Sequence, residues 1–482
     1  MTSSVLLPGF DGTELPDWLE RRLRDGLGGV CLFGMNIASR EQLRELTSAI
    51  YAVNPHAVIA IDEEGGDVTR LYQREGSPFP GNAVLGRLAD AALTERVGAQ
   101  VGWELRQAGV GLALAPDADV NSNPDNPVIG IRSFGTDPAA VAEHAAAWTR
   151  GIEATGVASC AKHFPGHGDT SQDSHHALPV VEADGETLAQ RELVPFKAAI
   201  AAGARTIMSS HIVVPALDDV PATFSHRILG DLLRGELGFD GVIVSDALDM
   251  AGASADRGIP AAAVSALAAG VDLLCIGTSN TDEQLGEILG AIDAAIGDGS
   301  LPSEAVESAA ARVRSLGREL ARERDEVAIP GDLVPGAVPG LSRAQVRGAF
   351  HVSDAARDLL SRLHGRPVAW VAIETAPNMA VGTAPWGPFS AGVNPASVIT
   401  PDSELPPPRA GELTVVVGKD LHRHAFAGAA TAELKARGEV LVVDMGWPLP
   451  DCAGVDIATF GASRLVGAAL LDLIGRDSCG SE

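Results

Sequence analysis

Short apolar runs that alternate with longer helical patterns are the feature that most limits what this chain can fold into. The first runs, at 5–7 and 29–33, are each followed by helical spacing, over 18–27 and 40–53. Apolar strands separated by helices are typical of a parallel sheet with helices on both faces. Further strands are expected at 57–61, 110–115, 156–161, 206–208, 241–244 and 271–276, and further helices at 90–108, 138–155, 187–202, 225–236, 259–269, 282–296 and 303–322.

The number of these strand–helix units predicts the fold class. About eight units fit a (β/α)8 barrel, and a doubly wound open sheet is the alternative. Polar residues at the ends of several different strands favour the barrel, because barrel enzymes carry their active sites at the carboxyl ends of the strands. These residues are Asp62, Asp119, His163, His211 and Asp246.

A stretch rich in proline and glycine, residues 326–343, predicts a linker. Residues 1–325 are therefore expected to form the barrel that carries the chemistry. Residues 344–482 are expected to form a smaller α/β domain of unknown role. Its predicted elements are helices at 344–363 and 463–474 and strands at 367–373, 413–418, 440–444 and 457–460.

The charge balance and the cysteine content limit the possible partners and location. The chain has 63 acidic and 36 basic residues and a formal net charge of −27. Such a chain repels phosphate backbones and anionic lipid, so neither a nucleic acid nor a membrane is expected as a partner. The sequence shows no apolar run of about 18 residues, no secretory signal and no disulfide framework among its five cysteines. We expect a cytoplasmic protein, and the oligomeric state is not predicted.

One stretch, residues 162–176, gathers four histidines, two aspartates and a lysine directly after a predicted strand. Its glycines and proline are expected to break regular structure. Asp173 precedes His175 by two residues, so its carboxylate can accept from one imidazole nitrogen and make the other nitrogen more basic. A histidine of this kind gives and takes a proton near neutral pH. The alternative is a surface loop with chance polar residues.

A metal site is the competing interpretation of the same stretch. Its spacing matches no zinc pattern, such as two histidines four residues apart on a helix. We therefore expect neither a metal nor a cofactor. The residues competent as ligands are His163, His167, Asp169, Asp173, His175 and His176.

Other candidates follow other strands. Asp246 comes just after the strand at 241–244 and can act as a nucleophile, a base or a metal ligand, or can simply cap the next segment. Asp62 and Arg70 flank a glycine turn, where they either contact a polar ligand or close the turn as an ion pair. Arg132 lies among glycines in a predicted loop, and no role follows from it alone.

Together these motifs resemble glycoside hydrolase family 3, and within it the bacterial β-N-acetylglucosaminidases. The resemblance covers roughly residues 5–320. The run 162–168 followed by Asp173-Ser174-His175 is highly specific to this subgroup. The other motifs that carry it are 61–66 with Arg70, 129–135 with Arg132, and 238–241 with Ser245-Asp246.

The resemblance implies a retaining mechanism on a (β/α)8 barrel. Asp246 matches the family's nucleophile, which forms a covalent glycosyl-enzyme. His175 matches an acid/base histidine, where most retaining glycosidases use a second carboxylate, and Asp173 matches its dyad partner. Gly166 and Gly168 are candidate hinges of this loop. The residues that match those gripping the sugar and its N-acetyl group are Asp62, Arg70, Arg132, Lys162 and His163.

The expected function is that of an exo-acting β-N-acetylglucosaminidase that releases GlcNAc from cell-wall or chitin-type oligosaccharides. A phosphorylase of the same subgroup is the close alternative, because an imidazole does not repel an incoming phosphate as a carboxylate does. A metal-dependent hydrolase and a non-catalytic sugar-binding barrel are the alternatives from other classes. Glu63 and Asp67 depart from the family pattern, and both are expected to add negative charge beside the sugar pocket.

Overall fold

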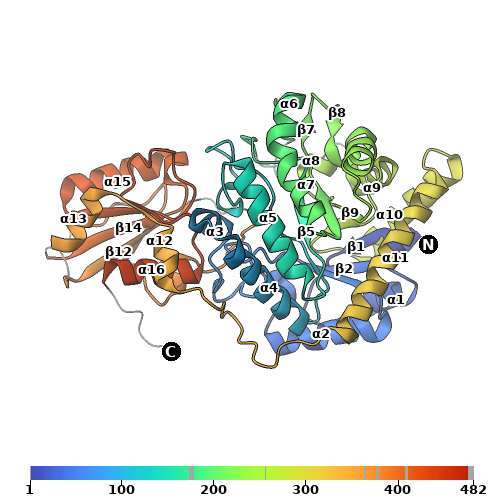
Figure 1. Ribbon diagram of the computed structural model, residues 1–482, viewed down its shortest axis with the longest axis horizontal. Helices are drawn as coiled ribbons and strands as arrows, with labels where there is room; N and C mark the ends of the chain where they lie inside the picture. The colour runs from blue at the N-terminus through green and yellow to red at the C-terminus, as the bar shows by residue number, and fades with distance from the viewer. Residues whose placement is uncertain are drawn as a thin grey trace.

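The computed structural model describes residues 2–172, 178–255, 257–362, 365–375, 379–407 and 411–475. Its N-terminal part alternates parallel strands with helices (Figure 1). The strands are β1 (Leu6–Pro8), β2 (Gly29–Leu32), β3 (Val58–Ile61), β4 (Leu112–Ala113), β5 (Cys160–Phe164), β6 (Thr206–Ser209), β9 (Val242–Ser245) and β10 (Leu274–Gly277). The longer helices are α1 (Asp17–Arg24), α2 (Arg40–Val53), α4 (Ala91–Gln107), α5 (Pro138–Glu153), α7 (Leu193–Ala201), α9 (Gly258–Ala269), α10 (Asp282–Asp298) and α11 (Ser303–Glu326).

Most of these strands pair in parallel with a neighbour in chain order. Ladders join β10 to β1, β2 to β3 to β4, and β5 to β6 to β9. Parallel bridges join Leu112 to Ala158, and Val244 to Leu273, which links the last of these ladders to the first. The N–H of Gly28, just before β2, donates to the carbonyl of Ser3, just before β1, at 3.1 Å. The N-terminal part is therefore an α/β structure, as expected.

The core explains why these strands are continuous apolar runs in the sequence. One cluster of buried side chains, which includes Leu7, Val58, Leu112 and Val244, comes mostly from the strands. A larger cluster packs the alternate strand positions, such as Ile59 and Ile243, against the helices. A parallel strand buried on both faces has no polar side to show.

Several elements differ from the expectation, and the helix expected at 225–236 is a π-helix, Arg227–Glu236. The strand expected at 156–161 is shifted to Cys160–Phe164, because the ladder to β6 continues to the pair Phe164 and Ser209. The helix expected at 187–202 is divided by a π-helical turn, Leu188–Glu192, which follows the short helix α6 (Gly185–Thr187). An antiparallel hairpin, β7 (Val213–Val214) and β8 (Asp218–Pro221), was not expected at all.

The C-terminal part forms a second sheet of six strands in the order β11-β16-β15-β14-β12-β13. All neighbours are parallel except the edge strand β11. Helices α15 (Ala425–Arg437) and α16 (Arg464–Ile474) lie on opposite sides of it (Figure 1). The strands are β11 (His351–Val352), β12 (Val368–Ile373), β13 (Ser397–Ile399), β14 (Leu413–Gly418), β15 (Val440–Asp444) and β16 (Ile457–Ala458).

The expected helix over 344–363 is wrong. It is two helices, α12 (Arg343–Gly348) and α13 (Asp354–Arg362), separated by β11. The strand forms because His351 and Val352 pair with Ala458 and Ile457 of β16. Within the described ranges, no helix is both long and apolar enough to cross a membrane.

Candidate active site

A cavity of about 320 Å³ lies at the carboxyl ends of the N-terminal strands. It brings together six of the eight residues that the sequence predicts for the site. The other two, Asp173 and His175, lie outside the described residues. The six that line the cavity are Asp62, Arg70, Arg132, Lys162, His163 and Asp246.

Lys162 and Arg132 are held in the cavity wall by two carboxylates. Lys162 Nζ lies 2.8 Å from Asp62 Oδ1 and 2.8 Å from Glu64 Oε1. The Arg132 guanidinium donates to both carboxylate oxygens of Glu64, at 2.8 and 3.1 Å. Arg70 lies 3.4 Å from Asp62 and donates to the carbonyl of Ala380, at 2.9 Å, from the C-terminal part. The wall is thus a preformed set of fixed donors and acceptors, which is what recognition of sugar hydroxyls requires.

The charges in this wall stabilise one another. Burial opposes the ionised form of Asp62, but Lys162 and then Arg70 outweigh it and hold the carboxyl pKa well below its usual range. Burial would lower the pKa of Lys162, yet Asp62 and Glu64 raise it above its ordinary value. These shifts favour the charged forms of Asp62, Glu64, Lys162 and Arg132 near neutral pH.

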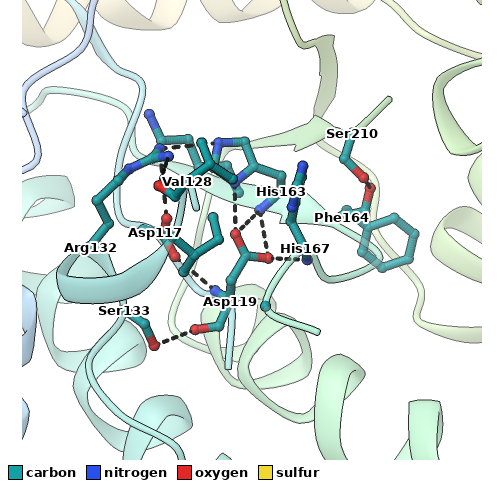
Figure 2. A network of polar contacts seen from close by, with 12 residues as sticks. Asp117, Asp119, Val128, Arg132, Ser133, His163, Phe164, His167 and Ser210 are labelled. Carbon is teal, nitrogen blue, oxygen red and sulfur yellow. Dashed lines mark hydrogen bonds and ion pairs between the residues drawn. The ribbon is translucent and has the colours of Figure 1, made fainter. Parts of the chain in front are cut away.

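Asp119 orients two neighbouring histidines, His163 and His167, as Figure 2 shows. Its carboxylate accepts from His163 Nδ1 at 2.7 Å and from the backbone N–H of His167 at 2.6 Å. Because a carboxylate only accepts, His163 carries its proton on Nδ1, and its Nε2 faces the Arg132 guanidinium at 3.3 Å. Burial lowers the pKa of His167 to about 4, so its ring is neutral near pH 7.

Asp117 lies beside this network and accepts from the backbone N–H of Asp119 at 3.0 Å. Burial and then the nearby Asp119 raise its carboxyl pKa well above the usual value. Its ligand atom lies within 4.8 Å of those of Asp119 and His163, a spacing that a metal ion can use. The oxygens of Asp119 already accept from three N–H groups, and the Arg132 guanidinium lies 3.7 Å from Asp117. These groups fit hydrogen bonding better than metal coordination.

The metal ligands suggested by the sequence do not converge where they are described. His163 is bonded to Asp119, and His167 Nδ1 lies 2.9 Å from Thr170 Oγ1. Asp169 forms an ion pair with Arg191 instead. Asp173, His175 and His176 lie outside the described residues.

Asp246 stands at the end of β9, on the cavity wall and half-buried. Its backbone N–H donates to Ser209 of β6 at 3.2 Å, which continues the ladder between the two strands by one residue. One carboxylate oxygen accepts from the N–H of Ala247 at 2.8 Å. The strand ladder therefore fixes the backbone position of Asp246, and the cavity gives its carboxylate access to a ligand.

The loop that follows β5 is anchored by the π-helical turn beneath it. Arg191 pairs with Asp169 of the loop and with Glu192, whose side chain is fully buried. A Cβ on Gly166 would lie 2.7 Å from the Glu192 side chain, and one on Gly168 would lie 1.8 Å from the Val120 carbonyl oxygen. Close packing therefore requires both glycines. Their expected role as hinges stays a hypothesis.

Glu192 makes the stability of the fold depend on pH. Burial raises its carboxyl pKa from 4.5 to about 7. Between these two values the folded protein binds a proton that the unfolded chain has released, so stability falls as the pH rises. Glu192→Gln removes the titrating carboxyl group. The decrease in the free energy of unfolding between pH 5 and 8 is therefore expected to be smaller in this variant by up to about 3 kcal/mol. Urea unfolding at several pH values measures it, and parallel curves for both proteins would contradict the assignment.

Sequence reasoning missed Glu64, although this residue holds both Arg132 and Lys162. The sequence shows three acidic residues, Asp62, Glu63 and Glu64, after one strand, but not which of them face the cavity. Asp119 was noticed only as a polar residue at a strand end. Its role depends on its contact with His163, which lies on another strand.

Glu64→Gln is expected to lower the free energy of unfolding by about 3 kcal/mol, because it leaves two buried cations short of a partner. The same change should raise KM, since Arg132 and Lys162 lose their fixed positions. Glu95→Gln is the matched control, because its ion pair with Arg150 is about half exposed and contributes less than about 1 kcal/mol. Equal destabilisation of the two variants, measured by urea unfolding, would contradict the role given to Glu64.

Glu63 and Asp67 do not charge the sugar pocket, contrary to the expectation. Glu63 is fully buried and accepts from Thr69 Oγ1 and from the backbone N–H groups of Arg70 and Leu71, so it shapes the turn. Asp67 accepts from the N–H of Ala462 and pairs with Lys419, both in the C-terminal part. Neither residue lines the cavity around Asp246. The sequence could not show this, because the partners of Asp67 are distant along the chain.

This chain is similar to known proteins and to one family model. The model of the family described as "Glycosyl hydrolase family 3 N terminal domain" matches residues 13–316. Beta-hexosaminidase A of Pseudoalteromonas piscicida is 36% identical over 345 residues, 66% of this chain and 58% of that protein. The beta-hexosaminidase of Chromobacterium violaceum is 43% identical over 276 residues, 55% of this chain and 75% of that protein.

A solved structure extends the likeness to the C-terminal part. The glycoside hydrolase family 3 beta-N-acetylglucosaminidase from Paenibacillus sp. str. FPU-7 matches with a TM-score of 0.83 and 29% identity. The match covers 98% of this chain and 95% of that one. The family model covers more than half of the chain, including the six predicted site residues that line the cavity. The chain therefore belongs to glycosyl hydrolase family 3.

Proposed function

We propose that this protein is a retaining exo-β-N-acetylglucosaminidase that acts on cell-wall or chitin-type oligosaccharides. The observation that carries the proposal is the single cavity in which Asp246 faces the fixed donors and acceptors Asp62, Arg132 and Lys162. The relatives named as beta-hexosaminidases support the choice of an N-acetylated amino sugar. A carboxylate that lines the cavity beside such a wall is suited to attack on a bound sugar.

We further propose that the eight parallel strands of residues 1–325 close into a (β/α)8 barrel. The ladders and bridges that run from β10 through β1 and from β2 to β9 support closure. Residues 344–482 are then a separate, smaller α/β domain, with 326–343 as the linker. The separate apolar cluster around Val415, Val443 and Leu470 supports this division.

The reaction proceeds in two steps that share one acid/base. In the first, an oxygen of Asp246 attacks the anomeric carbon while His175 gives its proton to the departing glycosidic oxygen. In the second, His175 takes a proton from water, the water oxygen attacks the same carbon, and the bond to Asp246 breaks. Two inversions give net retention. Asp173 would hold His175 in the required tautomer. The roles of these two residues rest on the sequence motif.

The sugar-binding residues give the substrate its position before the chemistry. In this proposal Asp62 accepts hydrogen bonds from hydroxyl groups, and Arg70, Arg132 and Lys162 donate to hydroxyl or acetamido oxygens. The unprotonated Nε2 of His163 accepts from a hydroxyl group. Because these groups are already fixed by one another, little ordering accompanies substrate binding.

The proposed activity is tested by comparing an aryl β-GlcNAc with the matching aryl β-glucoside. We expect the wild-type protein to release the aryl group from the first at least about a hundredfold faster, because a site with buried donors rejects a substrate that leaves them unpaired. Absence of turnover of the aryl β-GlcNAc would contradict the proposal.

Phosphorolysis is the second candidate, and the feature that favours it is the imidazole acid/base predicted at His175. Phosphate would replace water in the second step, and the product would be GlcNAc-1-phosphate instead of GlcNAc. We expect turnover without phosphate to equal turnover with it. A strong dependence on phosphate, with GlcNAc-1-phosphate as product, would replace the hydrolase assignment.

A further inference from the structure

A second cavity, of about 470 Å³, lies where the C-terminal sheet meets the N-terminal part. It is separate from the cavity around Asp246, and only Ile129 and Arg132 line both. Of the described residues that have a role in the proposed reaction, only Arg132 lines this second cavity. The polar side chains that the C-terminal part contributes are Glu374, Thr375, Thr383, Trp386, Lys419, Asp420, Arg423 and His424.

The order of the C-terminal strands places this cavity at a position where open parallel sheets bind ligands. Read from β13, the parallel strands run β13-β12-β14-β15-β16, so the chain leaves β12 to one side and returns on its other side as β14. In an open sheet, such a reversal leaves a crevice between the carboxyl ends of the two central strands. Glu374 and Thr375 directly follow β12, and Lys419 and Asp420 directly follow β14. All four line the cavity.

The cations of this cavity are only partly neutralised. The half-buried Arg423 guanidinium donates to the backbone carbonyl of Asn126 at 3.1 Å, and no ion pair joins it to an acidic side chain among the described residues. Lys419 Nζ lies 3.4 Å from Asp67 and 5.0 Å from the centre of the Trp386 ring. An arginine without a carboxylate partner is suited to bind one from a ligand, through paired N–H donors.

The remaining walls suit a sugar ring. Trp386 offers an indole surface, while Ile131, Ile373 and Val381 provide apolar contact. Glu374 and Asp420 supply acceptors for hydroxyl groups. A flat apolar surface with a few polar groups that fix orientation is the usual make-up of a small-molecule site.

We propose that this cavity is a second saccharide site, which binds a sugar that carries a carboxylate. Arg423 binds the carboxylate, Lys419 adds positive charge, and Trp386 contacts the ring. The site does not take part in bond cleavage. It gives the C-terminal part of the chain a binding role that the catalytic cavity does not depend on.

N-acetylmuramic acid and GlcNAc are a matched pair of probes, because the first is the second with a carboxylate-bearing lactyl ether. Isothermal titration of the full-length protein is done with N-acetylmuramic acid in the presence of saturating GlcNAc. We expect one molecule to bind, and Arg423→Gln to weaken this binding at least about tenfold, since a charge-assisted hydrogen bond is lost. Arg437→Gln, on an exposed i,i+4 pair with Glu433, is the control and should bind as the wild type does.

The exposed Glu374 supplies a variant that carries little risk to folding. Glu374→Gln removes a negative charge from the same cavity and should tighten binding of N-acetylmuramic acid by a few fold. Absence of binding by the wild type, or equal affinity in the wild type and Arg423→Gln, would overturn the proposal. The comparison needs no turnover, so it gives an answer even if the proposed hydrolase activity fails.

Discussion

Replacing Asp246 with asparagine is expected to lower kcat on an aryl β-GlcNAc by at least about 10⁴-fold, in line with losses measured when other covalent nucleophiles are removed. Asparagine has nearly the same shape as aspartate but a weak, uncharged nucleophile in place of the carboxylate. The half-buried position of Asp246 and its backbone contact with Ser209 do not depend on its charge, so the fold should persist. Stopped assays over hours, with the purified protein, measure the residual rate.

Asp249 provides the control for this experiment. It lines the same cavity three residues further along the chain, and it is exposed. Asp249→Asn is expected to keep kcat within about tenfold of the wild type. A carboxylate that does not form the covalent bond affects kcat only through the electrostatic effect of its charge. If Asp249→Asn lost as much activity as Asp246→Asn, the assignment of a single nucleophile would be wrong.

His175→Ala is expected to lower kcat/KM on oligosaccharide substrates by about 10² to 10⁴-fold, the usual contribution of a general acid. For dinitrophenyl β-GlcNAc, kcat/KM should fall far less. This quantity reports formation of the glycosyl-enzyme, and dinitrophenolate leaves in that step without a proton. The measurement is kcat/KM for a series of aryl glycosides whose leaving groups differ in pKa. The variant should show a steep dependence on that pKa where the wild type shows a shallow one.

His176→Ala is the matched control, since it removes the neighbouring imidazole from the same sequence. It should retain the shallow dependence of the wild type. Equal losses on good and poor leaving groups in His175→Ala would mean that this residue is not the general acid.

The sequence predicted the N-terminal strands well because each is buried on both faces, which leaves a run of apolar residues with no polar interruption. It misplaced β5 because Lys162 and His163 were taken for loop residues. Both are buried in the strand, where Asp62, Glu64 and Asp119 satisfy their polar atoms. A charged residue can lie in a buried strand when its partners come from neighbouring strands, and such partners are invisible in a single sequence.

The candidate site was predicted where residues are tied to a local motif and missed where they act across the fold. Asp246 and His163 were singled out as polar residues at the ends of predicted strands, and Lys162 through the resemblance to the family. Glu64 was missed because Glu63 and Glu64 look alike in the sequence. Only the contact between Glu64 and Arg132, which is distant along the chain, shows which of the two faces the cavity. The hydrogen bond from Arg70 to the carbonyl of Ala380 forms because the C-terminal part packs against the N-terminal part. The composition of the linker does not predict this packing.

The second sheet shows the same limit. Strands β12, β14 and β15 were predicted from apolar runs, but β13 was missed because Ser397–Ile399 is short and partly exposed. Without β13 the sequence gives no reversal of strand order, and so no reason to look for a crevice beside Lys419.

Trapping the covalent intermediate tests the central claim most directly. A dinitrophenyl β-GlcNAc with fluorine at C5 slows both steps by destabilising the oxocarbenium-like transition states, while its leaving group restores the first step alone. The protein should then gain the mass of one fluorinated N-acetylglucosaminyl group, and peptide mapping should place it on Asp246. A protein that turns over the aryl glycoside without any adduct, or one that carries the adduct on another residue, would contradict retention through Asp246.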